Sequence, residues 1–167
     1  LFEEAATATT GSIIDALLKG IGPRTRVVGL TWVHSSSGIR LPIREIAAAL
    51  RARPGPPLLL LVDGVHGLGS TDETVATMGC DYFCAGTHKW MFAPRGTGLV
   101  WASAENWARL RPLIPSFTDI DQYQAWERQE APTTPTTADR MAPGGFHAYE
   151  HQWATAAAFR MHRQMGR

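Results

Sequence analysis

Lys89 is one of only two lysines in a chain that carries fourteen arginines, and it lies in the string GTHKW at residues 86–90, directly after an apolar run. Arginine stays protonated near neutral pH, whereas a desolvated lysine can lose its proton, become a neutral amine nucleophile and form a Schiff base. Asp63 ends a second apolar run 26 residues upstream, a separation long enough for one helical crossover between neighbouring parallel strands. The two side chains therefore indicate an amine nucleophile with a carboxylate near it.

The elements that must position these residues alternate between strand and helix signals. Apolar runs without polar alternation indicate strands buried on both faces, which is typical of a parallel sheet. Apolar residues at helical spacing indicate helices between them. The order is a helix at 12–20, a strand at 26–33, a helix at 42–53, a strand at 58–62, a short helix at 71–78, and strands at 81–85 and 98–102. This order predicts a three-layer α/β fold with a mostly parallel sheet and flanking helices.

The chain changes character after residue 104. A helix is expected at 106–110, and residues 112–143 then carry five prolines with many Thr and Gln residues. This composition indicates an extended loop that covers a site or a partner. A final helix is expected at about 149–165, with Trp153, Ala156, Ala157 and Met161 on its packing side. The length of the chain favours a single domain.

Polar side chains follow three of the predicted strands. They are His34 after the first strand, Asp63 and His66 after the second, and Thr87, His88 and Lys89 after the third. In open parallel sheets, ligands bind beyond the carboxyl ends of the strands. Three independent strand ends therefore predict one shared site, although any one of these residues alone would be weak evidence.

Three strings in this region resemble those of the class V aminotransferase family of pyridoxal-phosphate enzymes. They are DGVHG at 63–67, AGTHKW at 85–90 and PRGTG at 94–98. The strings TWVHSSSG at 31–38 and PGGF at 143–146 are similar to those of the branch with isopenicillin N epimerase-like proteins and the carbon–sulfur lyases of ergothioneine synthesis. Because family members are much longer, the resemblance implies that residues 1–167 are part of the cofactor-binding large domain of a fold type I enzyme.

The resemblance also implies roles for individual residues. Lys89 would form the Schiff base with pyridoxal phosphate and, once freed, move the substrate α-proton as a general base. Asp63 would pair with the protonated pyridine nitrogen and keep the ring an electron sink. His66 would contact the 3-oxygen side of the ring.

Further roles follow from the same resemblance. His34 would lie near His66 at the ring, and Thr87 and His88 would donate hydrogen bonds to the phosphate. Gly144 and Gly145 would lie at the interface of a homodimer, near the partner's phosphate site. The implied substrate is an amino acid or a similar amine, and three reaction types stay open: epimerisation, C–S lysis and transamination.

Each role has a simpler structural alternative. Lys89 could be a solvated surface lysine, Asp63 could cap the next helix, and the histidines could be ordinary hydrogen-bonded side chains. The string HAYEH at 147–151 also matches an inverted zinc-peptidase pattern, with His147 and His151 as ligands and Glu150 as base. That hydrolase is the weaker reading because no Asp or Glu follows His151 to complete the ligand set. A third reading is a truncated, non-catalytic domain.

Composition excludes other classes of function. The formal net charge of +1 and the scattered arginines argue against nucleic-acid binding. No apolar stretch approaches the roughly 18 residues that cross a bilayer. Cys80 and Cys84, on one strand, would be too far apart for a disulfide, so we expect free thiols, no metal and a cytoplasmic protein. The sequence begins at Leu1 rather than Met, so we expect the true N-terminus of the gene product, and any export signal, to precede it.

Overall fold

The computed structural model describes residues 5–112, 115, 119–141 and 148–166. Two compact units make up the chain: the first comprises Leu1–Val100 and Glu150–Arg167, and the second comprises Trp101–Tyr149. The first unit contains six of the predicted site residues: His34, Asp63, His66, Thr87, His88 and Lys89. Each unit is described by itself.

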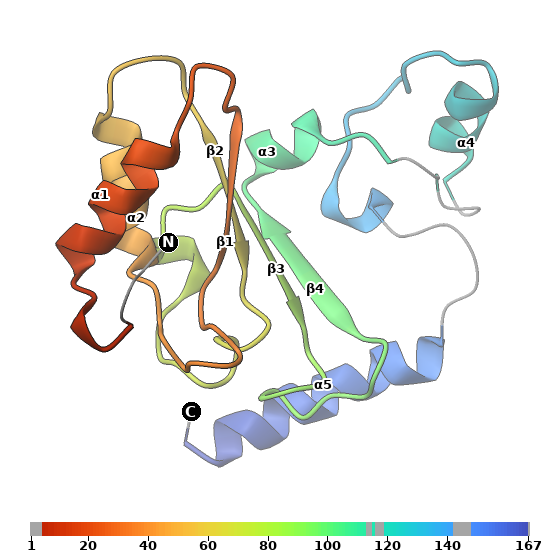
Figure 1. Ribbon diagram of the computed structural model, residues 1–167. Coiled ribbons are helices and arrows are strands. Elements are labelled where there is room, and N and C mark those ends of the chain that lie inside the picture. The colour runs from red at the N-terminus through yellow and green to blue at the C-terminus, as the bar shows by residue number, and fades with distance from the viewer. Residues whose placement is uncertain (1–4, 113–114, 116–118, 142–147, 167) are drawn as a thin grey trace. The chain divides into compact units, whose positions relative to one another are not determined.

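A four-stranded sheet forms the centre of the first unit, in the order β1-β2-β3-β4. The strands β1 (Val27–Thr31), β2 (Leu59–Asp63) and β3 (Tyr82–Gly86) pair in parallel, and β4 (Gly98–Ala102) runs in the opposite direction beside β3 (Figure 1). Thr31 is aligned with Asp63, and Asp63 with Cys84, so the three parallel strands end at one edge. The predicted α/β fold with a mostly parallel sheet is confirmed.

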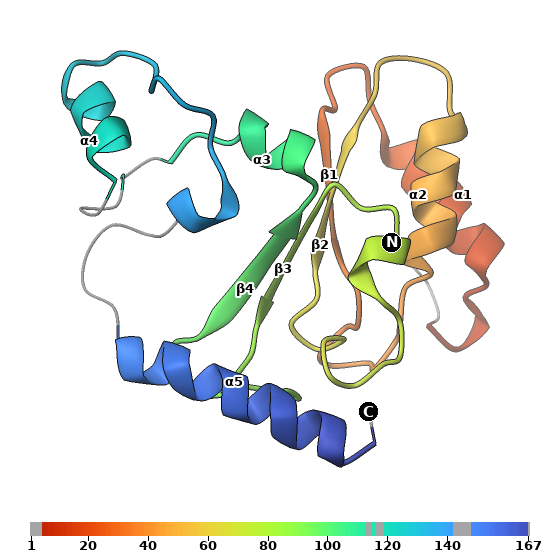
Figure 2. The same cartoon turned by 180° about the vertical axis from the view of Figure 1, so that it is seen from behind.

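Helices α1 (Thr10–Gly20) and α2 (Ile43–Ala52) lie together on one face of this sheet (Figures 1 and 2). A capping box begins α1, in which Thr9 and Ser12 bond to each other's backbone. The apolar residues of α2 that recur at helical spacing are all buried: Ile43, Ile46, Ala47 and Leu50. They cover the sheet as their spacing predicts.

The short helix predicted at 71–78 is wrong in extent. Only a 3₁₀ turn forms there, at Val75–Thr77. Thr71, Thr74, Val75 and Thr77 are β-branched and lose rotamer freedom in a helix, which lowers their helix propensity.

In the second unit, the prediction of an extended loop over 112–143 is wrong at its centre. After α3 (Ala104–Arg109), which Ser103 caps, α4 forms at Ile120–Glu127 and a 3₁₀ turn at Ala138–Arg140. Asp119 caps α4 by accepting a hydrogen bond from the Gln122 amide at 3.1 Å. No proline occurs between 116 and 131, so the prolines bound this helix rather than prevent it.

Arg140 ties the 3₁₀ turn of the second unit to the start of α4. Its guanidinium forms ion pairs with Asp119 at 2.6 Å and with Asp121 at 3.3 Å. The hydroxyl groups of Thr133 and Thr134 donate to Asp121 at 2.8 Å, and these bonds, together with Arg140, hold the pKa of that carboxyl well below its usual range.

The final helix, α5 (Tyr149–Gln164), has the predicted extent, but the predicted packing side is wrong. Its buried residues are Ala158 and His162, whereas Trp153, Ala156, Ala157 and Met161 are exposed. The face is set by a polar contact, because the Nε2 atom of His162 bonds the carbonyl oxygen of Gly69 at 2.9 Å. Within the described residues, no helix is both long and apolar enough to span a membrane.

Candidate functional site

Lys89 and His66 meet at the edge where the parallel strands end. Lys89 lies in the loop after β3 and His66 in the loop after β2, and the Nζ atom of Lys89 is 2.7 Å from the Nε2 atom of His66. Both side chains reach solvent, Lys89 more than His66. The predicted convergence of these two strand ends is therefore present as a direct hydrogen bond.

Asp63 is the last residue of β2, and its half-buried carboxylate begins the same loop. Its Oδ1 atom accepts a hydrogen bond from the amide of Val65 at 3.0 Å. The other carboxylate oxygen makes no hydrogen bond to any residue that the structure describes. One oxygen thus fixes the loop, and the other can accept a bond from a ligand.

Two glycines let this loop lie directly on buried aromatic rings. A Cβ atom on Gly64 would lie 1.9 Å from the ring of Phe83, and one on Gly67 would lie 2.0 Å from the ring of Trp32. These two rings are at most 1% exposed and pack edge to face, with centroids 6.1 Å apart. Close packing against these two rings therefore holds the backbone of residues 63–67 in place.

Trp90 adds a contact that the sequence did not predict. Its indole Nε1 donates a hydrogen bond to the Nδ1 atom of His66 at 3.4 Å, so both ring nitrogens of His66 have partners in the 89–90 segment. The position of a tryptophan directly after the lysine is the one signal that could have pointed to it.

The two loops also interlock through their backbones. Gly69 has a φ of +84°, and a Cβ atom there would lie 2.9 Å from the carbonyl group of Trp90. Only glycine fits this conformation and this close approach without strain. His162 of α5 also bonds the carbonyl of Gly69, at 2.9 Å. A shift of Gly69 would therefore displace the backbone of Trp90.

Thr87 is 1% exposed and takes part in a buried hydroxyl chain. Its Oγ1 atom lies 2.5 Å from that of Thr97, and Thr97 in turn donates to the carbonyl of Pro94 at 2.6 Å. Because Thr97 uses its own proton for Pro94, Thr87 must be the donor to Thr97. The hydroxyl that was predicted to bind phosphate thus has an internal partner here, and its phosphate role stays a prediction.

His88 and His34 are exposed and have local surroundings. The ring of His88 lies over Gly86, with its Cε1 atom 2.9 Å from the place that a Cβ atom would take. The Nδ1 atom of His34 bonds the hydroxyl groups of Ser36 and Ser37, each at 3.2 Å. The structure shows neither histidine bonded to Lys89 or His66, so their predicted roles at the phosphate and the ring stay predictions.

The zinc alternative finds no support among the described residues. The Nδ1 atom of His151 bonds the carbonyl oxygen of Arg95 at 3.1 Å, and no group of three or more His, Cys, Asp or Glu residues that could hold a metal occurs in the described part of the chain. His147, Gly144 and Gly145 lie outside the described residues.

The cysteines are free thiols, as predicted. Burial raises the pKa of Cys80 to about 11. Burial also raises the pKa of Cys84, and the charge of Asp63 adds to that effect. Neither side chain is a ready thiolate near neutral pH, so neither suits nucleophilic catalysis.

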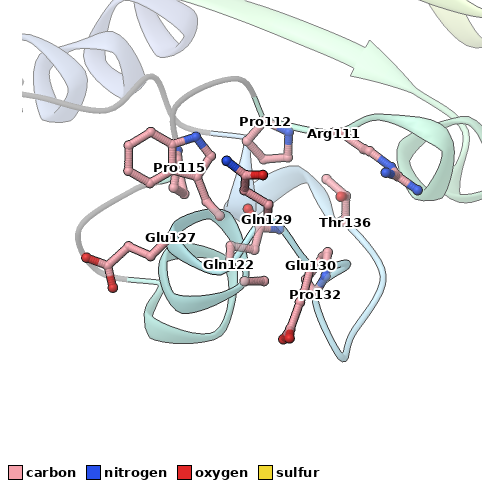
Figure 3. A pocket seen from close by; sticks show the side chains of 11 residues that line it. Arg111, Pro112, Pro115, Gln122, Glu127, Gln129, Glu130, Pro132 and Thr136 are labelled. Carbon is pink, nitrogen blue, oxygen red and sulfur yellow. The ribbon is translucent and has the colours of Figure 1, made fainter.

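A cavity of about 690 Å³ lies in the second unit (Figure 3). The residues that line it include Pro115, Trp126, Glu127, Glu130 and Pro132. None of the residues predicted to do chemistry lines it. The strand-end cluster in the first unit therefore remains the candidate site.

Comparisons with known proteins place this chain in a family. Residues 4–153 match the family model described as Aminotransferase class-V. An isopenicillin N epimerase from Streptomyces clavuligerus is 31% identical over 128 residues, which are 77% of this chain and 30% of the epimerase. The match bears out the resemblance drawn from the motifs.

Solved structures show the same fold. A complex of the cystine C–S lyase C-DES with its reaction product, cysteine persulfide, has a TM-score of 0.81 and 28% identity, and the match covers 98% of this chain and 42% of the lyase. A mutant of that lyase with glycine covalently linked to its PLP cofactor has a TM-score of 0.77 and 24% identity, with the same coverage. The chain thus spans less than half the length of each of these proteins.

Proposed function

Because this chain belongs to the class-V aminotransferase family, we propose that the protein containing it is a pyridoxal-phosphate enzyme that acts on an amino acid or a similar amine. The observation that carries the proposal is the 2.7 Å contact between Lys89 and His66, in the loops that follow β3 and β2, with Asp63 as the last residue of β2. A primary amine, an imidazole and a carboxylate with one oxygen that bonds no described residue form the set of groups that this cofactor needs. The residues therefore fit the group.

When bound, pyridoxal phosphate supplies an aldehyde that condenses with a primary amine and a ring that withdraws electrons from the substrate. Lys89, an exposed residue, would supply the amine, and its Nζ atom would accept the substrate α-proton once it is free. Asp63, whose Oδ1 atom is held by Val65, would keep the ring nitrogen protonated. His66 would donate a hydrogen bond to the cofactor.

The remaining binding residues are proposed from the family resemblance. Thr87 and His88 would contact the phosphate, and His34 would lie near the ring. Because the hydroxyl of Thr87 bonds Thr97, we infer that Thr87 contributes to phosphate binding through its backbone or by shaping the loop. The cofactor affinity of a Thr87→Val variant, which lacks the hydroxyl, would separate a direct contact of the hydroxyl with phosphate from such an indirect contribution.

The reaction type is proposed as epimerisation, C–S lysis or transamination of an amino acid. Two relatives support the first two types, since one is an isopenicillin N epimerase and another a cystine C–S lyase. A desulfurase mechanism with a thiolate from this chain is disfavoured, because burial raises the pKa of both Cys80 and Cys84. Any catalytic thiolate would have to come from elsewhere in the protein.

Absorbance spectroscopy of the full-length protein tests the cofactor proposal. We expect a visible band that borohydride removes, with the reduced cofactor found by peptide mapping on Lys89. Lys89→Ala should abolish turnover and covalent trapping but still bind the cofactor. The only other lysine in the chain, Lys19, provides the matched control, and Lys19→Ala should leave both unchanged. A protein that stays colourless when pyridoxal phosphate is added, or one trapped elsewhere than Lys89, would refute the proposal.

We further propose a cytoplasmic homodimer with the site near the subunit interface. The free thiols of Cys80 and Cys84 support a reducing compartment. Exposed apolar side chains on α5, with Trp153 at 75% and Met161 at 44%, support a further contact surface. Sedimentation of the full-length protein should give twice the mass of one chain, and cell fractionation should place it in the cytoplasm; a monomer or an exported protein would contradict the respective part.

A further inference from the structure

The hydrogen bond from Trp90 to His66 determines which nitrogen of His66 carries its proton. An indole N–H can only donate, so the Nδ1 atom of His66, 3.4 Å from the Nε1 atom of Trp90, must be the acceptor. A nitrogen that accepts carries no proton. The imidazolium and the Nδ1–H tautomer are both incompatible with this bond, which leaves the neutral ring with its proton on Nε2.

This tautomer directs an N–H group at Lys89. The Nε2 atom of His66 lies 2.7 Å from the Nζ atom of Lys89, so Nε2 is the donor and Nζ the acceptor. The lone pair of Nζ that accepts this bond is the one that attacks an aldehyde.

Neighbouring residues contact the backbone on both sides of this bond, and Trp90 itself is 48% exposed. Gly69 packs against the carbonyl group of Trp90, where a Cβ atom would come within 2.9 Å, and His162 bonds the carbonyl of Gly69. The carbonyl of His66 accepts a hydrogen bond from Ser70 at 2.6 Å, which fixes the other partner. Both ends of the contact from Trp90 to His66 are thus anchored by neighbouring residues.

We propose that Trp90 is a positioning residue that makes His66 a fixed hydrogen-bond donor at Nε2, directed at the reacting nitrogen of Lys89. The proposal rests on the proposed function for its consequence in catalysis. The same donor suits a bound cofactor, because the ring oxygen that His66 is proposed to face is an acceptor. Trp90 thus acts through His66, without itself contacting the reacting atoms.

The direct test is the ¹⁵N spectrum of the full-length protein, prepared without cofactor and labelled at histidine, with the signal of His66 assigned by its loss in His66→Gln. We expect His66 to have an unprotonated Nδ1 atom and a protonated Nε2 atom. Trp90→Phe should give a mixture of tautomers, whereas Trp153→Phe, at a tryptophan on α5, should leave the His66 signals unchanged. A protonated Nδ1 atom in the unaltered protein would overturn the proposal even if Trp90→Phe failed to fold.

A kinetic readout complements the spectrum. The rate at which added pyridoxal phosphate becomes trapped on Lys89 by borohydride should fall about two- to tenfold in Trp90→Phe, as expected for the loss of one hydrogen bond. An unchanged tautomer together with an unchanged rate in this variant would refute the role of Trp90. Failure of the proposed function would look different, because Lys89 would then not be trapped in the unaltered protein either.

Discussion

Replacing Thr97 with valine tests whether the hydroxyl chain behind Lys89 holds the loop together. The change keeps the shape of the side chain but removes the acceptor for Thr87, at 2.5 Å, and the donor to Pro94, at 2.6 Å. The hydroxyl of Thr87 is then buried without a partner, which costs about 1–3 kcal/mol, while the carbonyl of Pro94 is half-buried and can bond water. We expect Thr97→Val to lower the local stability of the loop by about 2 kcal/mol.

Thr87→Val and the double variant separate structure from ligand binding. Thr87→Val removes one hydrogen bond but leaves no buried donor without a partner, so we expect it to lower local stability by about 1 kcal/mol. In the double variant the hydroxyl of Thr87 is absent and cannot be left without a partner. The loss of stability should therefore be smaller than the sum of the two single losses, with a coupling of about 1 kcal/mol. Such coupling is the signature of a direct bond between Thr87 and Thr97.

Hydrogen exchange of the full-length protein measures these losses locally. The amides of Thr87 and Ala93 report on the loop, because the first bonds the carbonyl of Thr97 and the second that of Thr87. A loss of about 2 kcal/mol should lower their protection by about 30-fold. Thr77→Val, at an exposed threonine whose hydroxyl bonds only within its own turn, serves as control. The reasoning is refuted if Thr87→Val weakens pyridoxal-phosphate binding, leaves amide protection unchanged and shows no coupling with Thr97→Val.

Three further expectations concern packing, charge and titration. Gly64→Ala should destabilise the cofactor-free protein by about 1–3 kcal/mol in urea because its Cβ would collide with a buried ring, whereas Gly29→Ala, which meets no atom within 4 Å, should be nearly neutral. Arg140→Met should lower amide protection in α4 more than Arg109→Met does. The reason is that the side chain of Arg140 is 17% exposed and that of Arg109 is 54% exposed, so the ion pair of Arg109 is better screened by water. Equal effects of the two variants would contradict this. The thiol of Cys80 should resist alkylation at pH 8, because its pKa in the folded protein is about 11 and its ordinary value is 9.0. Its contribution to stability should therefore be complete below pH 9 and decline as the pH rises toward 11. Denaturation at several pH values would measure this decline.

The contact between Lys89 and His66 was predictable because it follows from chain topology. Apolar runs without alternation specify parallel strands, and parallel strands place their carboxyl ends at one edge. Residues directly after two neighbouring strands must then lie close together, as the 2.7 Å contact between Lys89 and His66 confirms. No detail of side-chain packing is needed for this conclusion.

The contacts that orient these side chains could not be predicted in the same way. The partner of Thr87 is ten residues away across a turn, and the buried face of α5 is set by a histidine that bonds a carbonyl 93 residues away. Hydrophobic periodicity carries no information about which backbone carbonyl lacks a partner, so it favoured Trp153 and Met161 over His162 as the packing side. The contact from Trp90 to His66 was missed because it too is a polar contact between residues far apart in the sequence.

These unpredicted contacts share one physical purpose, since each fixes a loop that has no regular hydrogen-bond ladder of its own. The loop after β2 lies on the rings of Trp32 and Phe83, the loop after β3 is held by Thr97, and His162 joins the two through Gly69. A reacting amine gains rate when its position is fixed before the substrate arrives, because less entropy is then lost in the transition state. The supports around Lys89 are therefore as much part of the proposed catalytic apparatus as the lysine, and weakening Thr97 should slow trapping on Lys89 even though its hydroxyl touches neither the amine nor His66.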